Sequence, residues 1–423
     1  MAAEQSFAHP DITPFKPTRA AWAVLGLCFA LALLGRGMGE TFTVFLLPIS
    51  NDFGWARADV ISIYALASLS MGLSSPFVGR LFDFSGPRAV YGLGLLLLGA
   101  GVSLAAFANT LWQLQACMGI AVGLGMACLG NVPSSLLLGR WFGNRLPTAM
   151  AIVYSANGAG VLTLVPLSQV LIDHFEWRNS YHLLGSVLLA LLIPLLLLPW
   201  RRIAKQTARI SGEASVKVIA TPVTTINEIE WTLLSAMRHH AFWALFSTFF
   251  FTAIGVYTIG VQVVAYLIES GFPPLQAASA WGLSGVVLVI GMLTVSWLDT
   301  LIGRRRAILF SYGLTTIGIV CLWLLSRFPN LWLLGGFLVC FGSTIGSRGP
   351  LITAAAINIF HGKRVGTIFG TISIGSGLGS ALGALVGGLI HDWSHSYDLV
   401  IAFALVNVLL GMIPFLTVRA LRE

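Results

Sequence analysis

The sequence predicts an all-α membrane protein with twelve transmembrane helices, arranged as two pseudo-symmetric six-helix bundles around a central cavity. The 423-residue chain is 57% hydrophobic and only 9% charged, whereas about a quarter of the residues in a soluble domain are charged. Its apolar runs are long enough to cross about 30 Å of hydrocarbon. One short loop sequence occurs twice, about half a chain apart, which indicates two related halves.

The first bundle is predicted over residues 20–199, after a polar N-terminal segment of residues 1–19. Its first apolar run is longer than the core of a signal peptide, and no small-residue cleavage pattern follows it. We therefore expect this run to be retained as a membrane span. The six predicted spans cover residues 20–48, 60–81, 88–108, 111–138, 148–171 and 182–199.

A polar linker is predicted over residues 200–239, between the two bundles. Its Ser/Thr/Val-rich middle, residues 214–226, has the composition of a flexible linker, and residues 228–239 fit a short amphipathic helix on the membrane surface. The second bundle covers residues 240–418, and residues 419–423 form a short tail. Its six predicted spans cover residues 240–267, 275–298, 306–325, 331–359, 365–390 and 397–418.

The distribution of basic residues predicts the orientation of the chain. Of the 24 Lys and Arg, 19 lie in the two tails and the even-numbered connections, three lie in the odd-numbered connections, and two lie inside spans. Basic residues concentrate on the cytoplasmic side, so both termini are expected in the cytoplasm of a multi-pass cell-membrane protein. The net charge of +8 then reflects topology, and we expect no nucleic-acid partner.

The duplicated loop joins spans two and three, and again spans eight and nine. Both copies contain an acid, a glycine three or four residues later, and then arginine. The first copy reads Gly79-Arg80-Leu81-Phe82-Asp83-Phe84-Ser85-Gly86-Pro87-Arg88, and the second reads Ser296-Trp297-Leu298-Asp299-Thr300-Leu301-Ile302-Gly303-Arg304-Arg305-Arg306.

The first copy resembles the signature of the major facilitator superfamily between helices two and three. That signature is Gly, three residues, Asp, Arg, any residue, Gly, Arg, Arg. Phe84 and Pro87 stand where it has arginines, while the residues that match are Gly79, Asp83, Gly86 and Arg88. The second copy keeps Asp299 and the arginines, including Arg305. The resemblance implies that these residues form a cytoplasmic latch that closes the inner side of a cavity. The alternative is a topology signal with a loop cap.

Further motifs are similar to the monocarboxylate and oxalate/formate branch of that superfamily. They are Asp52-Phe53-Gly54-Trp55 with Arg57, Arg140-Trp141-Phe142, Glu176-Trp177-Arg178, and Tyr266 to Gly271. This chain departs from the branch in two places. Residues 284–293 of span eight lack the arginine usual there, and Glu40 stands near the position of a lysine in animal members. An anion site would therefore have to be built around Arg36 and Arg348.

Three charged residues lie within predicted spans and are the leading site candidates. Arg36 and Glu40 are four residues apart in span one, so they share a helix face and can pair. Arg348 lies in span ten with no acid nearby in sequence, so Glu40 or a substrate anion would have to serve as its partner. A charge inside hydrocarbon is costly unless it is paired or faces water. The alternative for the first two is a neutral pair that only supports packing.

The superfamily resemblance implies that spans one, four, seven and ten line the cavity. Asn131 in span four and Gln262 in span seven could then add hydrogen bonds to the substrate. The planar guanidinium fork suits a carboxylate, and a buried Glu40 could take up a proton with it. Several aromatic residues could stack on a substrate ring, although such residues are more often in the core or facing lipid: Tyr64, Tyr154, Tyr257 and Trp281.

We therefore predict a monomeric secondary transporter for a small organic anion, coupled to protons by symport or working by anion exchange. An exporter of drugs or cationic metabolites by proton antiport is the alternative, with Glu40 binding the cation. A membrane enzyme would need a catalytic cluster, and the eight histidines are unpaired and mostly outside the spans. The five cysteines lie inside spans without CxxC spacing, so neither a metal, a cofactor nor a disulfide framework is expected.

Overall fold

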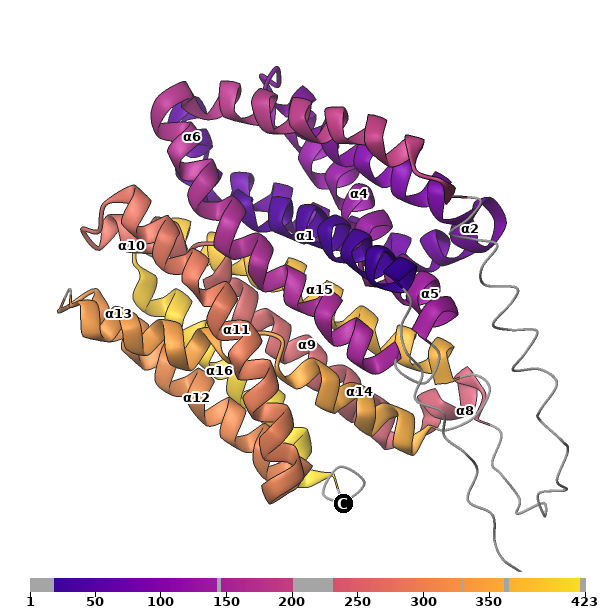
Figure 1. Ribbon diagram of the computed structural model, residues 1–423. Coiled ribbons are helices and arrows are strands. Elements are labelled where there is room, and N and C mark those ends of the chain that lie inside the picture. Colours follow the sequence, from indigo (N-terminus) through magenta and orange to yellow (C-terminus); the bar gives the residue numbers. More distant parts are fainter. Residues whose placement is uncertain (1–18, 143–145, 201–230, 329, 361–364, 419–423) are drawn as a thin grey trace, which may run out of the picture.

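The computed structural model describes residues 19–142, 146–200, 231–328, 330–360 and 365–418. All regular secondary structure in these ranges is helical. The helices form two groups that follow the order of the sequence, with the indigo and magenta helices of the first half above the orange and yellow helices of the second (Figure 1). Residues 1–18 and 419–423 of the predicted tails and residues 201–230 of the predicted linker, including 214–226, lie outside the described ranges.

The first bundle makes six passes from seven helical elements. Two elements each contain two passes, because α2 turns at Gly86 (φ 76°, ψ 175°) and α6 turns at Glu176 (φ 63°, ψ 166°). The fourth pass is assembled from short elements and is interrupted at Gly130. The elements are α1 (Arg19–Phe53), α2 (Arg57–Ala105), α3 (Leu111–Leu114), η1 (Gln115–Ala121), α4 (Val122–Leu129), α5 (Asn131–Phe142) and α6 (Leu146–Leu197).

The second bundle follows a short helix, α8 (Leu233–Arg238), which lies inside the predicted surface segment and begins at a Thr232 cap. Its tenth pass is interrupted between Gly342 and Arg348, at the position that matches the Gly130 break. The elements of this bundle are α9 (His240–Gly260), α10 (Val263–Glu269), α11 (Pro274–Ile302), α12 (Arg304–Leu325), α13 (Leu331–Phe337), η3 (Leu338–Gly342), α14 (Arg348–Ile359), α15 (Val365–Ser394) and α16 (Tyr397–Thr417).

The helices account for the predicted spans. Ten segments within the described residues are long and apolar enough to cross a membrane. One of them, Ile152–Leu197, covers two passes because the chain turns at Glu176. A shorter apolar segment, Leu331–Gly342, begins the tenth pass. The predicted twelve-helix fold is therefore confirmed.

The internal repeat is visible in the backbone as well as in the sequence. Six of the seven described residues with positive φ occur at matching turns of the two halves, Gly346 being the seventh, and the pairs are Gly54 with Gly271, Gly86 with Gly303, and Glu176 with His395. The first and third pairs lie at one end of the bundles, here called the Gly54 end, and the second pair lies at the opposite Gly86 end. The duplicated loop thus keeps its turn, because glycine tolerates positive φ in both copies.

Small residues bring the two bundles into close contact. The bundles meet where α2 packs on α15 and α6 packs on α11. At the second contact, a Cβ added to Gly285 would lie 2.0 Å from the carbonyl oxygen of Gly158. At the first, a Cβ added to Gly388 would lie 3.1 Å from the Cα of Ala58. Glycine at such crossings lets helix backbones approach closely in a membrane.

Candidate functional site

The central charged residues form a pair on α1 that reaches the other bundle. Arg36 and Glu40 lie one helical turn apart, and Arg36 Nη2 donates to Glu40 Oε1 at 3.3 Å. The same nitrogen donates to the Tyr257 hydroxyl of α9 at 3.3 Å. Only 21% of the Arg36 side chain and 15% of the Glu40 side chain are exposed. Arg36 therefore links the bundles within the membrane-spanning part of the fold.

A cavity of about 30 Å³ opens beside Arg36 and is lined by residues of both bundles. Its polar lining is Arg36, Tyr64, Ser68, Tyr257 and Ser380. Four methionines contribute most of the flexible apolar wall: Met38, Met71, Met118 and Met126. In this conformation the space suffices for about two waters, so an organic substrate needs a wider cavity. Methionine side chains are flexible, so a cavity lined by them can change shape readily.

Three aromatic side chains from the two bundles lie next to one another along the wall of the cavity. The ring of Tyr64 lies 5.7 Å from that of Phe42 and 6.3 Å from that of Tyr257. Of the four aromatics considered from the sequence, Tyr64 and Tyr257 line the cavity. Tyr154 is 36% exposed, and the buried Trp281 packs in the core. One guanidinium beside hydroxyls, rings and thioethers suits an anion that carries an apolar body.

Arg348 is buried at the start of α14, where only 3% of the residue is exposed. Its Nε donates to the Ser311 hydroxyl at 2.8 Å, and its Nη2 bonds the Thr315 hydroxyl. Its guanidinium carbon lies 4.1 Å from the ring centroid of Tyr312. These partners all come from α12, whereas Glu40 pairs with Arg36, so the structure does not bring Arg348 and Glu40 together. Within the described residues, Nη1 of Arg348 has no hydrogen-bond partner.

The two predicted amide residues lie apart from the Arg36 cavity. Asn131 begins α5 directly after the Gly130 break and is half-buried. Gln262 joins α9 to α10, is 2% exposed, and lines a second, smaller cavity with Tyr266 and Tyr397. Its Nε2 is 3.5 Å from the Thr258 carbonyl, and its Oε1 has no partner among the described residues.

The duplicated loops lie at the Gly86 end, where they turn through Gly86 and Gly303. Asp299 Oδ1 is 3.9 Å from Arg304 Nε, within the second loop. Arg305 Nε is buried without a hydrogen-bond partner in the described part of the chain, and Arg88 is exposed. A Cβ added to Gly79 would lie 3.8 Å from Val132. The side chain of Asp83 lies outside the described part of the structure.

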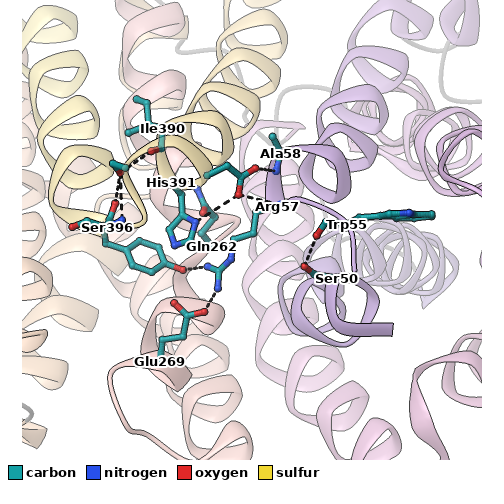
Figure 2. A network of polar contacts seen from close by, with 12 residues as sticks. Ser50, Trp55, Arg57, Ala58, Gln262, Glu269, Ile390, His391 and Ser396 are labelled. Atoms are coloured by element: carbon teal, nitrogen blue, oxygen red, sulfur yellow. Dashed lines mark hydrogen bonds and ion pairs between the residues drawn. The ribbon is translucent and has the colours of Figure 1, made fainter. Parts of the chain in front are cut away.

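A polar cluster at the Gly54 end, shown in Figure 2, was not predicted from the sequence. Arg57, the first residue of α2, forms an ion pair with Glu269 of α10 and a hydrogen bond with Tyr397 of α16. Asp392 of α15 accepts hydrogen bonds from the backbone of Arg57 and Ala58. The sequence signal for this cluster is the rarity of basic residues in the odd-numbered connections, where Arg57 is one of three.

Two helical bundles of membrane-spanning length with a charged cavity between them have the architecture of a membrane transporter. The chain belongs to the Major Facilitator Superfamily, whose family model matches residues 25–347 and 292–422. It is 25% identical over 415 residues to the MFS-type transporter YcxA of Bacillus subtilis (strain 168). The aligned region covers 96% of this chain and 98% of that protein.

Mammalian monocarboxylate transporters are also similar to this chain. Monocarboxylate transporter 12 of Mus musculus is 25% identical over 374 residues, or 83% of this chain and 75% of that protein. Monocarboxylate transporter 3 of Rattus norvegicus is 28% identical over 339 residues, or 78% of this chain and 66% of that protein. The predicted family is therefore confirmed, and the chain is a multi-pass membrane transporter and not an enzyme.

Proposed function

We propose that this protein carries a small organic anion with a carboxylate group across the cell membrane, together with a proton. The halves would rock so that the Arg36 cavity faces one side at a time. The observation that carries the proposal is the Arg36–Glu40 pair beside a cavity shared by both bundles. The similarity to proteins named monocarboxylate transporters supports the same class of substrate.

The pair offers a direct way to couple the anion to a proton. While Glu40 is ionised, its carboxylate neutralises Arg36 and occupies one of the guanidinium donors. Protonation of Glu40 leaves the guanidinium with a net positive charge and frees it for a substrate carboxylate. The loaded site then holds no uncompensated charge, as a low-dielectric cavity requires. Anion exchange would use the same arginine without protonation of Glu40.

Arg348, Asn131 and Gln262 are proposed as further substrate contacts in the widened cavity. For Arg348 the supporting observation is its Nη1, which has no hydrogen-bond partner among the described residues, whereas Nε and Nη2 bind side chains of α12. The Gly86 end is proposed to face the cytoplasm with both termini, and its loops are proposed to form the inner latch. The latch residues are Gly79, Asp83, Gly86, Arg88, Asp299 and Arg305.

Uptake of labelled carboxylates into proteoliposomes with an inward proton gradient tests this function. We expect Arg36→Lys to lower uptake about 10- to 100-fold, because hydrogen bonds to charged groups contribute about 1.5–3 kcal/mol each. Glu40→Gln should abolish the stimulation by the gradient. Arg327→Lys is the matched control, because Arg327 lies over Trp323 at the protein edge, 4.5 Å from the ring. If both site variants transport like the unmodified protein, the proposed site is wrong, whereas Glu40-dependent transport of organic cations would favour proton antiport.

A further inference from the structure

The Arg57 cluster joins the two bundles at the Gly54 end through side chains from four helices (Figure 2). The guanidinium of Arg57, on the first bundle, contacts the Glu269 carboxylate and the Tyr397 hydroxyl, both on the second bundle. Its carbon also lies 5.6 Å from the Tyr397 ring centroid. Only 12% of the Arg57 side chain is exposed. The Glu269 side chain is 41% exposed, so the guanidinium is shielded from solvent while its carboxylate partner stays partly in water.

A second connection in the cluster uses the start of a helix. The residue before α2 is Ala56, whose side chain cannot cap the helix. Asp392 from the opposite bundle supplies the missing acceptors, because its Oδ1 and Oδ2 lie 3.1 Å and 2.7 Å from the backbone nitrogens of Arg57 and Ala58. A carboxylate at a helix N-terminus is stabilised by the free N–H groups and the helix dipole. Separation of the bundles would therefore leave this helix end uncapped.

The first half of the chain contains a corresponding corner that stays within one bundle. Asp52, two residues before Gly54, pairs with Arg178, two residues after Glu176, at 3.2 Å. Arg178 Nη1 also donates to the carbonyl oxygens of Ala106 and Ala108. This corner holds the ends of three passes of the first bundle together.

In the second half, the position that matches Asp52 is again acidic, but the position that matches Arg178 is not basic. Glu269 stands two residues before Gly271, as Asp52 stands before Gly54. Tyr397 stands two residues after His395, where the matching position of the first half has Arg178. The second half thus has the acid of the corner without its arginine, and Arg57 of the first bundle supplies that cation.

We propose that Arg57 is the gate residue of the Gly54 end, and that its links to Glu269, Tyr397 and Asp392 hold this end of the carrier closed. These links must break before the substrate can pass on that side. The proposal rests on the proposed transport function, in which the Gly54 end faces outward. By contrast, Arg178 has its contacts within its own bundle, and these contacts remain in every state of the carrier.

Labelling of one cysteine in the cavity tests the gate without any substrate. The reporter is Ser68→Cys, beside Arg36, in full-length protein whose native cysteines 28, 117, 128, 321 and 340 are replaced. A membrane-impermeant thiol reagent is added to intact vesicles. A second reporter, Trp112→Cys, is 66% exposed near the Gly54 end. It measures the fraction of molecules that present this end to the reagent.

We expect Arg57→Ala to raise the normalised labelling rate at least about tenfold, which corresponds to about 1.4 kcal/mol. Arg178→Ala is the matched control, because it also removes an arginine from an ion pair with an acid, and the rate should stay within about twofold of the parent. Glu269→Gln and Asp392→Asn should raise the rate by smaller factors. They keep the test decisive if Arg57→Ala does not fold.

Equal labelling of the Arg57, Glu269 and Asp392 variants and the parent would overturn the gate, and so would an equal rise with Arg178→Ala. A failure of the proposed function gives a different result. In that case no carboxylate is transported by the unmodified protein, while the labelling rates still report whether the Gly54 end is closed.

Discussion

The glycine crossing between α6 and α11 gives a quantitative prediction for the equilibrium between carrier states. Gly158 and Gly285 belong to different bundles, and the backbone of each occupies the space that a side chain on the other would need. A Cβ at Gly285 would lie 2.0 Å from the oxygen and 2.8 Å from the carbonyl carbon of Gly158. Non-bonded carbon atoms pack best at about 3.5–4.0 Å. Gly285→Ala therefore forces the two helices apart by about 1 Å or more.

The cost of this substitution falls on the conformation in which the bundles touch. Overpacking by one methyl group costs about 1–3 kcal/mol when backbone atoms must move. Such a cost changes the ratio of two conformations about 5- to 150-fold. We expect Gly285→Ala to shift the carrier away from the observed arrangement by a factor in this range. Gly158→Ala meets the Gly285 oxygen at 2.1 Å and should have a similar effect.

The Ser68→Cys labelling assay measures this shift, with thermal unfolding recorded in parallel. Gly313→Ala is the matched control, because a Cβ at Gly313 of α12 meets no heavy atom within 4 Å. Its labelling should stay within about twofold of the parent. The two crossing variants disturb one contact, so their combination should be less than additive. Unchanged labelling in Gly285→Ala, or an equal change in Gly313→Ala, would refute the argument.

Two further predictions concern stability. Glu176 is an exposed residue in a backbone region that glycine normally occupies (φ 63°, ψ 166°), so Glu176→Gly should raise the thermal unfolding temperature by relieving about 1–3 kcal/mol of strain. Gly86→Ala, in the same region, should lower it, and equal effects of the two would contradict this reasoning. The pKa of His239 lies below its ordinary value of 6.5, mainly because the ring is partly desolvated and secondly because of the electrostatic effect of the neighbouring His240. The neutral ring accepts the Ala241 N–H at 3.3 Å, so its contribution to stability is present above pH 6.5 and is lost as the pH falls below it. His239→Asn, which can cap without titrating, should remove that part of the pH dependence of unfolding, and an unchanged dependence would contradict the assignment.

The passes and the repeated turns could be predicted because their causes are local. A span is an uninterrupted apolar run, and the turn in each duplicated loop needs a glycine, which the sequence has three residues after the acid in the first copy and four residues after it in the second. The Arg36–Glu40 contact was also predictable, since residues four apart on a helix are neighbours. In each case the signal and its effect lie within a few residues of one another.

The surroundings of Arg348 and Arg57 depend on contacts that no sequence period encodes. Arg348 was expected to need an acid or an anion, whereas the structure surrounds it with hydroxyl groups and a ring from α12, and Ser and Thr are common in many spans. Arg57 and Asp392 are 335 residues apart in the sequence, and their contact follows only from how the bundles pack. Alignment of the two halves on their glycines would have shown that Glu269 matches Asp52 and that its arginine is missing.

On the proposed mechanism, the substrate itself would loosen one of the links between the bundles. Nη2 of Arg36 serves both Glu40 and Tyr257, so a bound carboxylate competes with the inter-bundle bond as well as with the pair. The link at Arg57 lies at the Gly54 end and does not involve this cavity, so it would remain after the anion binds. Opening of the Gly54 end then requires loss of both links, and only the first is sensitive to substrate. The bond to Tyr257 and the gate at Arg57 both stabilise the closed arrangement, so opening of the Gly54 end would cost the free energy of both links in the empty carrier and of the Arg57 link alone once the anion is bound.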